Sequence, residues 1–94
     1  MASNEPRFKL GRVVATPGAL QAIEASGDLP IVLLARHLHS DPGALDKEDV
    51  AANEQAIECG FRILSAYLLI DGTKIWILTE ADRSATTLLL PSEY

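Results

Sequence analysis

Residues 61–90 read FRILSAYLLIDGTKIWILTEADRSATTLLL, and this stretch decides the fold. From Phe61 onward the sequence changes to the period of two that is typical of β-strands. The turn Ile70-Asp71-Gly72 separates two apolar runs, and Asp-Gly in that position is the strongest short-range signal for a hairpin. We therefore predict a three-stranded antiparallel meander, with strands over Phe61–Leu69, Thr73–Thr79 and Ala85–Leu90.

Two registers are open for the first hairpin. A two-residue turn would set Tyr67 opposite Trp76, whereas a three-residue loop with a left-handed Gly72 would set Tyr67 opposite Ile75. A slip of one residue changes every cross-strand partner. The three-residue loop is favoured because Thr73 then begins a clean strand.

The segment before the meander predicts a strand and two short helices. Phe8–Ala15 is rich in β-branched and apolar residues and reads as a strand. Thr16 can cap a helix that begins at Pro17 and runs to Ala25. Asp28 is the predicted cap of the second helix, which runs to Leu38 or His39 with Ile31, Leu34 and Leu38 recurring at helical spacing.

A third helix is predicted from Asp46 to the residue before Gly60, with Asp46 as its cap. Its apolar stripe is thin, so we expect it to lie on the surface. The whole chain is then one α+β domain, residues 1–94, with an N-terminal strand, two to three short helices and the C-terminal three-stranded antiparallel β-meander. Residues 1–6 read as a loose polar tail.

The composition limits the classes of partner. The 94 residues carry a net charge of −5, which disfavours direct binding to nucleic acid because that binding depends on basic side chains. An acidic chain can instead dock on a basic protein. One cysteine, Cys59, excludes an intrachain disulfide and fits a reducing compartment. The longest apolar run is too short to span a bilayer, so we expect a cytoplasmic protein with no membrane association.

The most polar cluster lies between the last two predicted strands and consists of Glu80, Asp82, Arg83 and Ser84. As a recognition loop it would offer the Arg83 guanidinium as a two-pronged donor, with the carboxylates as acceptors. As a structural turn, Asp82 and Ser84 would bond nearby backbone N–H groups and Arg83 would pair with a carboxylate. The structural reading is favoured about two to one.

The other chemically active residues indicate no catalytic, metal or cofactor site. His37 and His39 are placed on the last turn of the second helix, where their rings diverge and where a protonated histidine interacts well with the helix dipole. Cys59 reads as a small buried or half-buried filler. No zinc spacing and no phosphate-binding glycine motif is present, so no cofactor is expected.

Tyr67 and Trp76 are candidate interface aromatics, although the core is their default location. Both hairpin strands are apolar at nearly every position. Three short helices can cover only one face of such a sheet, so the other face is a candidate for contact with a partner.

Residues 76–91, WILTEADRSATTLLLP, and the closing Glu93-Tyr94 carry a resemblance. Together with Val13–Leu20 and Leu34–His37 they are similar to a family of small bacterial proteins of unknown function found on plasmids and integrative elements. These proteins end in a TEADRSATT-x-LLP-x-EY-like motif. The resemblance implies a mobile-element accessory protein and supplies no mechanism.

Three functional hypotheses follow. The first is a non-enzymatic module that acts by protein–protein contact, for example as an inhibitor of a basic host nucleic-acid enzyme. The second is a homodimer that buries the uncovered sheet face or pairs an edge strand, Ala85–Leu90 or Phe8–Val14, across a two-fold axis. The third is a small hydrolase-like enzyme that would use Glu80, Asp82 and Arg83 together with His37 around a cavity.

Overall fold

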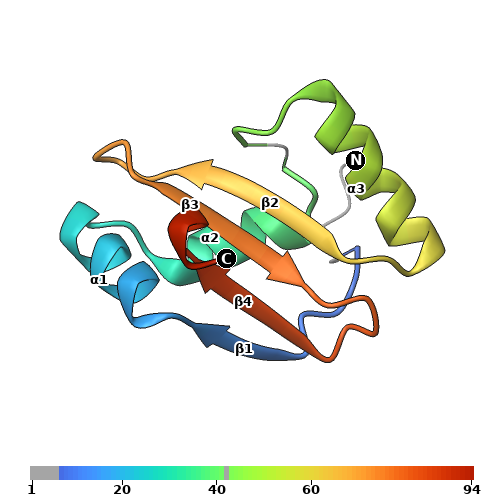
Figure 1. Cartoon of the computed structure of the whole chain (residues 1–94), viewed down its shortest axis with the longest axis horizontal. Coiled ribbons are helices and arrows are strands. Elements are labelled where there is room, and N and C mark those ends of the chain that lie inside the picture. The colour runs from blue at the N-terminus through green and yellow to red at the C-terminus, as the bar shows by residue number, and fades with distance from the viewer. Residues whose placement is uncertain (1–6, 42) are drawn as a thin grey trace.

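The computed structural model describes residues 7–41 and 43–94, so the predicted loose tail over residues 1–6 lies outside the described residues. In this part of the chain the elements are, in order, β1 (Arg12–Ala15), α1 (Pro17–Ser26), α2 (Pro30–Leu38), α3 (Lys47–Cys59), β2 (Ile63–Leu68), β3 (Lys74–Thr79), β4 (Ala85–Leu89) and the 3-10 turn η1 (Pro91–Glu93). The fold is α+β, with the N-terminal strand and the C-terminal meander that the sequence predicts (Figure 1).

The sheet has the order β1-β4-β3-β2. Strands β2, β3 and β4 are antiparallel neighbours and form the meander. Strand β1 returns to the sheet as the parallel neighbour of β4, with Arg12 opposite Ala85. The prediction of Ala85–Leu90 as an edge strand is therefore wrong, because β4 lies between β3 and β1. The edges belong to β1 and β2.

The hairpin between β2 and β3 uses the three-residue loop. Tyr67 lies opposite Ile75, and the Leu69 N–H donates to the carbonyl of Thr73 at 2.8 Å. Gly72 has φ 90°, a left-handed conformation that glycine adopts without strain. The favoured register is confirmed.

Local capping chemistry sets the start of two helices as predicted. The Thr16 hydroxyl accepts from the backbone N–H of Ala19 at 3.1 Å at the start of α1. The Asp46 carboxylate accepts from the N–H of Asp49 at 2.8 Å at the start of α3. Each hydrogen bond satisfies an N–H that has no partner inside the helix.

The start of α2 differs from the prediction. Leu29 is its N-cap and makes no side-chain capping bond. The Asp28 carboxylate instead accepts from the Ser26 hydroxyl at 2.6 Å and from the backbone N–H of Ile70 at 2.8 Å. Asp28 therefore ties the tip of the β2–β3 hairpin to the α1–α2 connection rather than capping a helix.

The buried face of α2 is also turned relative to the prediction. Leu33 and His37, one helical turn apart, are buried, whereas Ile31 is 73% exposed. The predicted inward residues Leu34 and Leu38 are half-buried. The apolar spacing of α2 favours the predicted face, but the sheet offers the Ser65 and Thr79 hydroxyls to His37. The face of Leu33 and His37 is buried instead.

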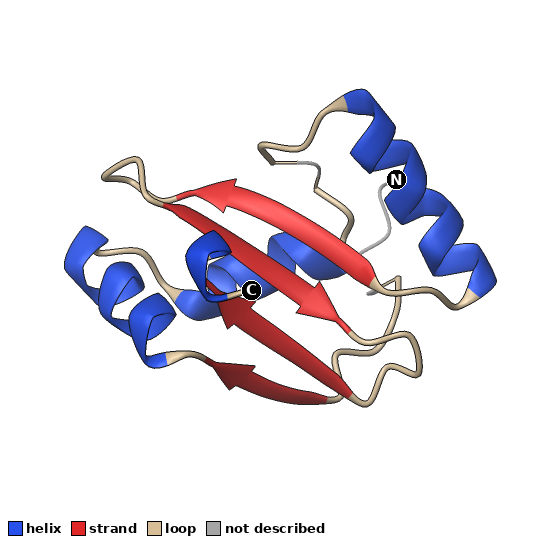
Figure 2. Ribbon diagram, viewed as in Figure 1, coloured by secondary structure: helices blue, strands red, loops and turns tan. Residues whose placement is uncertain are grey.

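Helices cover one face of the sheet. Helix α2 runs behind the strands in the view of Figure 2, and α3 lies beyond the outer side of β2. The covered face and the helices share one core, formed by Ala19, Ile23, Leu33, Tyr67, Leu69, Ile75, Ile77 and Leu88.

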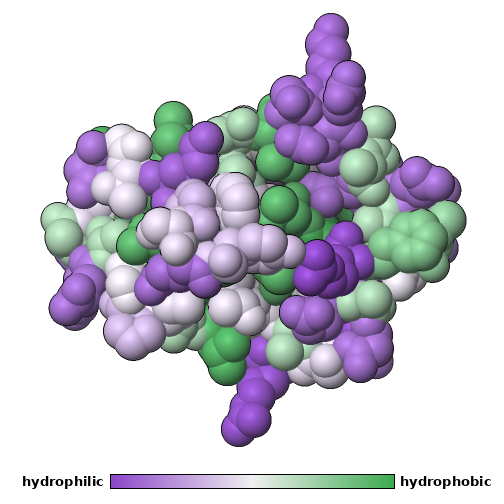
Figure 3. Space-filling view, viewed as in Figure 1, coloured by the Kyte–Doolittle hydropathy of each residue, from purple (hydrophilic) through white to green (hydrophobic). Residues whose placement is uncertain are grey.

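The opposite face of the sheet has a thin cover. Turn η1 lies in front of it, and the Tyr94 ring meets the Trp76 ring edge-on with centroids 5.6 Å apart. Figure 3 shows weakly polar residues over the middle of this face, apolar residues exposed between them and hydrophilic residues mainly at its margin. The expectation that the helices cover only one face is met.

In residues 7–41 and 43–94 no single helix is long and apolar enough to cross a membrane. Taken together, α1 and α2 have the length and composition of a bent span, with 107° between them.

Candidate functional site

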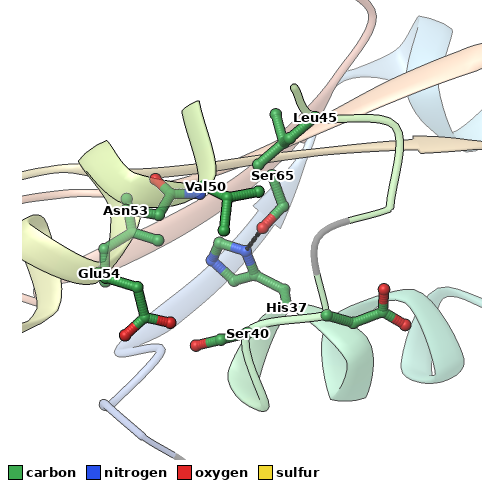
Figure 4. Close-up of a pocket in the computed structure, with 9 residues that line it drawn as sticks. His37, Ser40, Leu45, Val50, Asn53, Glu54 and Ser65 are labelled. Atoms are coloured by element: carbon green, nitrogen blue, oxygen red, sulfur yellow. Dashed lines mark hydrogen bonds between the residues drawn. The ribbon is translucent and has the colours of Figure 1, made fainter. Parts of the chain in front are cut away.

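A histidine with no exposed surface lies between α2 and the sheet. His37 Nδ1 is 2.6 Å from the Ser65 hydroxyl on β2, and Nε2 is 2.8 Å from the Thr79 hydroxyl on β3. Figure 4 shows the imidazole turned toward Ser65. Both ring nitrogens are thus hydrogen-bonded inside the core, as a buried polar group requires.

The hydrogen bonds continue from His37 across β3 and β4 toward β1, on the same face of the sheet. The Thr79 hydroxyl lies 2.7 Å from that of Thr86 on β4. Thr86 in turn donates to the carbonyl of Leu10 at 2.7 Å, just before β1. We call Ser65, His37, Thr79 and Thr86 the polar chain; it links α2, three strands and the N-terminal segment.

One carbonyl sets the direction of every proton in the polar chain. The Leu10 carbonyl can only accept, so the Thr86 hydroxyl donates its one hydrogen bond to it. Thr79 must then donate to Thr86, and it can only accept from His37. His37 therefore carries its proton on Nε2, and its bare Nδ1 accepts from the Ser65 hydroxyl. A neutral imidazole satisfies the whole chain.

The protonation state agrees with this hydrogen-bond pattern. Burial lowers the pKa of His37 from 6.5 to about 4, because the charged form loses its hydration inside the core. The edge of the Phe8 ring, 5.1 Å from the imidazole between centroids, adds apolar surroundings. His37 lies in the last turn of α2 as predicted, but it is buried and neutral near pH 7, so it brings no positive charge to the helix dipole.

A small cavity adjoins the polar chain. It is lined by His37, Ser40, Asp41, Leu45, Val50, Asn53, Glu54, Ile63 and Ser65. Its volume is about 10 Å³, which leaves room for at most one water molecule. Of the buried polar side-chain atoms in the described residues, only the Ser40 hydroxyl lacks a hydrogen-bond partner, and Ser40 adopts a left-handed conformation with φ 59°.

The hydrogen bond between Ser65 and His37 is like that between a serine nucleophile and its histidine base, but their surroundings do not suit catalysis. Ser65 is 3% exposed and the adjoining cavity holds no group as large as an ester. A base with a pKa near 4 also accepts protons poorly at neutral pH. The polar chain therefore acts as a buried structural network.

The Glu80–Ser84 segment forms a tight turn between β3 and β4. The Asp82 carboxylate accepts from the Ser84 N–H at 2.9 Å. The Arg83 guanidinium donates to the carbonyl oxygens of Phe61 at 2.6 Å and Ala56 at 3.0 Å. It also donates to the Glu80 carbonyl of its own turn at 3.1 Å, so its partners are backbone carbonyls rather than a carboxylate. None of the four predicted loop residues lines the cavity beside His37.

Tyr67 and Trp76 project from opposite faces of the sheet. Tyr67 is fully buried, donates to the Asp41 carbonyl at 2.8 Å and lies under the Arg36 guanidinium, 4.3 Å from the ring centroid. Trp76 lies half-buried on the thinly covered face, against Tyr94. Tyr67 therefore belongs to the core, whereas Trp76 is partly open to solvent.

The remaining reactive side chains stay apart. Cys59 is free and exposed, so the prediction of a buried or half-buried filler is wrong. It is the last residue of α3. His39 is exposed two residues beyond His37. Across residues 7–41 and 43–94 no three His, Cys, Asp or Glu side chains are placed to hold a metal ion.

Large apolar side chains are exposed at one end of the molecule. Leu29 is 61%, Ile31 73% and Val32 51% exposed at the start of α2, and Ile70 is 79% exposed at the hairpin tip. The Asp28–Ile70 hydrogen bond holds these two segments together. We call these four residues the end surface. An apolar cluster of this kind on a small domain indicates a contact surface.

The two edges of the sheet differ in how they are protected. On β2, the Asn53 side chain accepts from the Leu64 N–H at 3.1 Å and donates to the Leu64 carbonyl. The Ala44 N–H donates to the carbonyl of Ala66 at 2.8 Å. Helix α3 and the loop before it therefore occupy the outer side of β2, which is a common protection of sheet edges.

Strand β1 has no such cover from the part of the chain that the structure describes. The N–H groups of Arg12 and Thr16 donate inward to Ser84 and Leu88, so the alternation of a parallel ladder turns the N–H and C=O groups of Val13 and Ala15 outward. No hydrogen bond within residues 7–41 and 43–94 reaches these outward groups. Val13 and Val14 are 44% and 42% exposed.

No family model, curated protein or solved structure matches this chain. The functional reading therefore rests on the geometry described above.

Sequence reasoning missed the polar chain and the end surface. Ser65 and Thr79 interrupt the apolar alternation of β2 and β3 on the face that carries Tyr67 and Ile77. Two hydroxyls at inward positions signal a buried polar partner, since they would otherwise be unsatisfied. The end surface is signalled by Ile31-Val32-Leu33-Leu34, where four successive apolar residues exceed one buried face of a helix.

Proposed function

We propose that this protein is a non-enzymatic module that acts by binding another protein through the end surface. The observation that carries the proposal is the exposure of four aliphatic side chains by 51–79% where α2 meets the hairpin tip. Such residues gain free energy when a partner removes them from water, at about 25 cal/mol per Å² of apolar area.

Charge at the margin of the end surface indicates the partner's chemistry. Asp71 follows Ile70 and is exposed, and the Thr73 N–H donates to its carboxylate at 3.0 Å. This hydrogen bond lowers the pKa of Asp71 and keeps it negative. Lys74 is the nearby basic residue on the same hairpin, but the chain as a whole carries −5. A partner with an apolar patch bordered by Lys or Arg fits best.

A basic host enzyme that acts on nucleic acid belongs to this partner class, because its substrate groove is rich in Lys and Arg. An acidic protein docked beside such a groove competes with phosphate for the same cations. This role agrees with an accessory protein of a mobile element, which is the role that the resemblance of the C-terminal motif implies.

The test is comparative affinity capture from an extract of the cells that carry the protein. The variant combines Ile31→Lys with Ile70→Lys, which places two cations on the end surface. Phe61→Lys is the matched control, since Phe61 is 57% exposed in the connection between α3 and β2, at the other end of β2 from the hairpin tip. The free energy of unfolding of each variant should lie within about 0.5 kcal/mol of that of wild type, because exposed positions tolerate substitution.

We expect at least one protein to bind wild type and the Phe61→Lys control, and to be reduced at least tenfold with the double variant. Its binding should weaken as salt rises, because charge contributes at the margin. Identical sets of captured proteins for wild type and the double variant would remove the end surface as the binding site.

A further inference from the structure

We propose that the open edge of β1 pairs with β1 of a second copy of this chain, antiparallel and across a two-fold axis at Val14. This interface is separate from the end surface and does not depend on the proposed function. Both copies would contribute four strands to one continuous sheet centred on the axis.

The outward backbone groups of β1 specify this register. Val13 and Ala15 each turn an N–H and a C=O outward, with one residue between them. When Val13 of one copy faces Ala15 of the second, the two exchange a mutual pair of hydrogen bonds, and symmetry repeats the pair on the other side of the axis. Every outward group of β1 is then satisfied.

Neighbouring residues end the pairing on both sides. Gly11 has φ 64° and leaves the extended conformation. Pro17 starts α1 and has no N–H to donate. The pairing is therefore limited to Arg12–Thr16.

Charge complementarity supports a second copy as the occupant. In this register Arg12 lies opposite Thr16 of the second copy. The Thr16 hydroxyl donates to the Glu93 carboxylate, which also accepts from the Leu90 N–H at 2.9 Å. Trp76 lies on the sheet face that η1 covers, and its cross-strand partner is Leu89. Ala85, four residues before Leu89 on β4, points to the same face, and so does its partner Arg12. Thr16, four residues after Arg12, shares this face. Arg12 of each copy thus comes to the Glu93 carboxylate of the other.

The geometry also explains the exposure of Val14. Val14 is 42% exposed on the same face as Arg12, and on the axis it would meet Val14 of the second copy in a pair without mutual hydrogen bonds. Such pairs bring Cα atoms to about 4.5 Å. Figure 2 shows β1 at the margin of the sheet, with no described helix or strand outside it.

The mass in solution is the first test. Light scattering of wild type at micromolar to hundred-micromolar concentration should give twice the chain mass of 10.1 kDa. Val13→Pro removes an outward N–H without breaking a bond to β4, and Val14→Lys opposes two cations on the axis; both should restore the monomer mass. Leu68→Lys, at 56% exposure on the other edge strand, should leave the dimer intact.

Crosslinking tests the register itself. In a Cys59→Ser background, Val14→Cys should form an intermolecular disulfide under mild oxidation, because Cα atoms about 4.5 Å apart suit that bond. Arg12→Cys should not, since the two positions are offset by about 13 Å along the strands. A monomer at every concentration overturns the proposal. So does a dimer that tolerates Val14→Lys and Val13→Pro, or one that crosslinks equally through both cysteines.

Discussion

His37 sets a limit on the pH range of the folded protein. The unfolded chain binds a proton on this side chain near pH 6.5, whereas the folded chain does so only near pH 4. Between these values the unfolded form holds more protons, so stability falls as the pH decreases. The slope is about 1.4 kcal/mol per pH unit, and the loss from pH 6.5 to pH 4 is about 3 kcal/mol.

We therefore expect the free energy of unfolding of wild type, measured with urea, to decrease as the pH is lowered from 6.5 to 5. Most carboxyl groups titrate below this pH range. His37→Gln should be less stable at pH 7 but should lose this slope, because the titrating group is gone. The exposed His39 is the control: His39→Gln should keep the slope. An equal slope in the His37→Gln variant would show that other groups cause it.

Thr86 tests the proton order of the polar chain. Thr86→Val keeps the shape of the side chain but leaves the Leu10 carbonyl without a donor and the Thr79 hydroxyl without an acceptor. The expected cost in unfolding free energy is about 2 kcal/mol, since buried groups become unsatisfied. Thr87→Val, one residue along β4 on the thinly covered face, should change it by less than about 0.5 kcal/mol. Similar costs for the two variants would contradict the described network.

At the scale of elements, Asn53 protects the outer edge of β2. Asn53→Ala would remove both hydrogen bonds to the Leu64 backbone. We expect a loss of about 1–2 kcal/mol in unfolding free energy and more aggregation at high concentration, because an edge strand becomes available. Gln55→Ala on the exposed side of the same helix should do neither. The measurement is thermal unfolding combined with light scattering, and a soluble Asn53→Ala variant of unchanged stability would contradict this role.

Arg83 joins the β3–β4 turn to the end of α3. Arg83→Ala would leave the Ala56 and Phe61 carbonyls without this donor, at an expected cost of about 2 kcal/mol, because hydrogen bonds from a charged group are stronger than neutral ones. Arg62→Ala is the control, because among the described residues the Arg62 guanidinium bonds the Tyr94 hydroxyl alone, at 2.9 Å. An Arg83→Ala protein that melts like wild type would contradict the structural role and leave recognition open.

Elements whose signals are local could be predicted from the sequence. Thr16-Pro17, Asp46 and Asp71-Gly72 carry their capping or turn chemistry within a few residues, and each acts as expected. His37 could not be predicted in this way. Its hydrogen-bond partners are 28 and 42 residues away, so only the assembled sheet brings them together.

The whole molecule shows the same division between local and distant signals. The meander follows from alternation and one turn, whereas the parallel contact of β1 with β4 depends on Ala85 returning to Arg12. The uneven cover of the two sheet faces could be anticipated by counting helices. The difference between a protected β2 edge and an open β1 edge could not, because it depends on where the Asn53 side chain lies.

The parallel pairing of β1 with β4 has a consequence for biosynthesis. The ribosome makes Ala85 after Arg12, and the chain between them takes roughly 4 to 15 s at about 5–20 residues per second. During that time Val13 and Val14 have no strand beside them. The last strand of the sheet to be made thus completes the first, and a molecular chaperone that holds extended apolar segments can bind β1 before β4 is made.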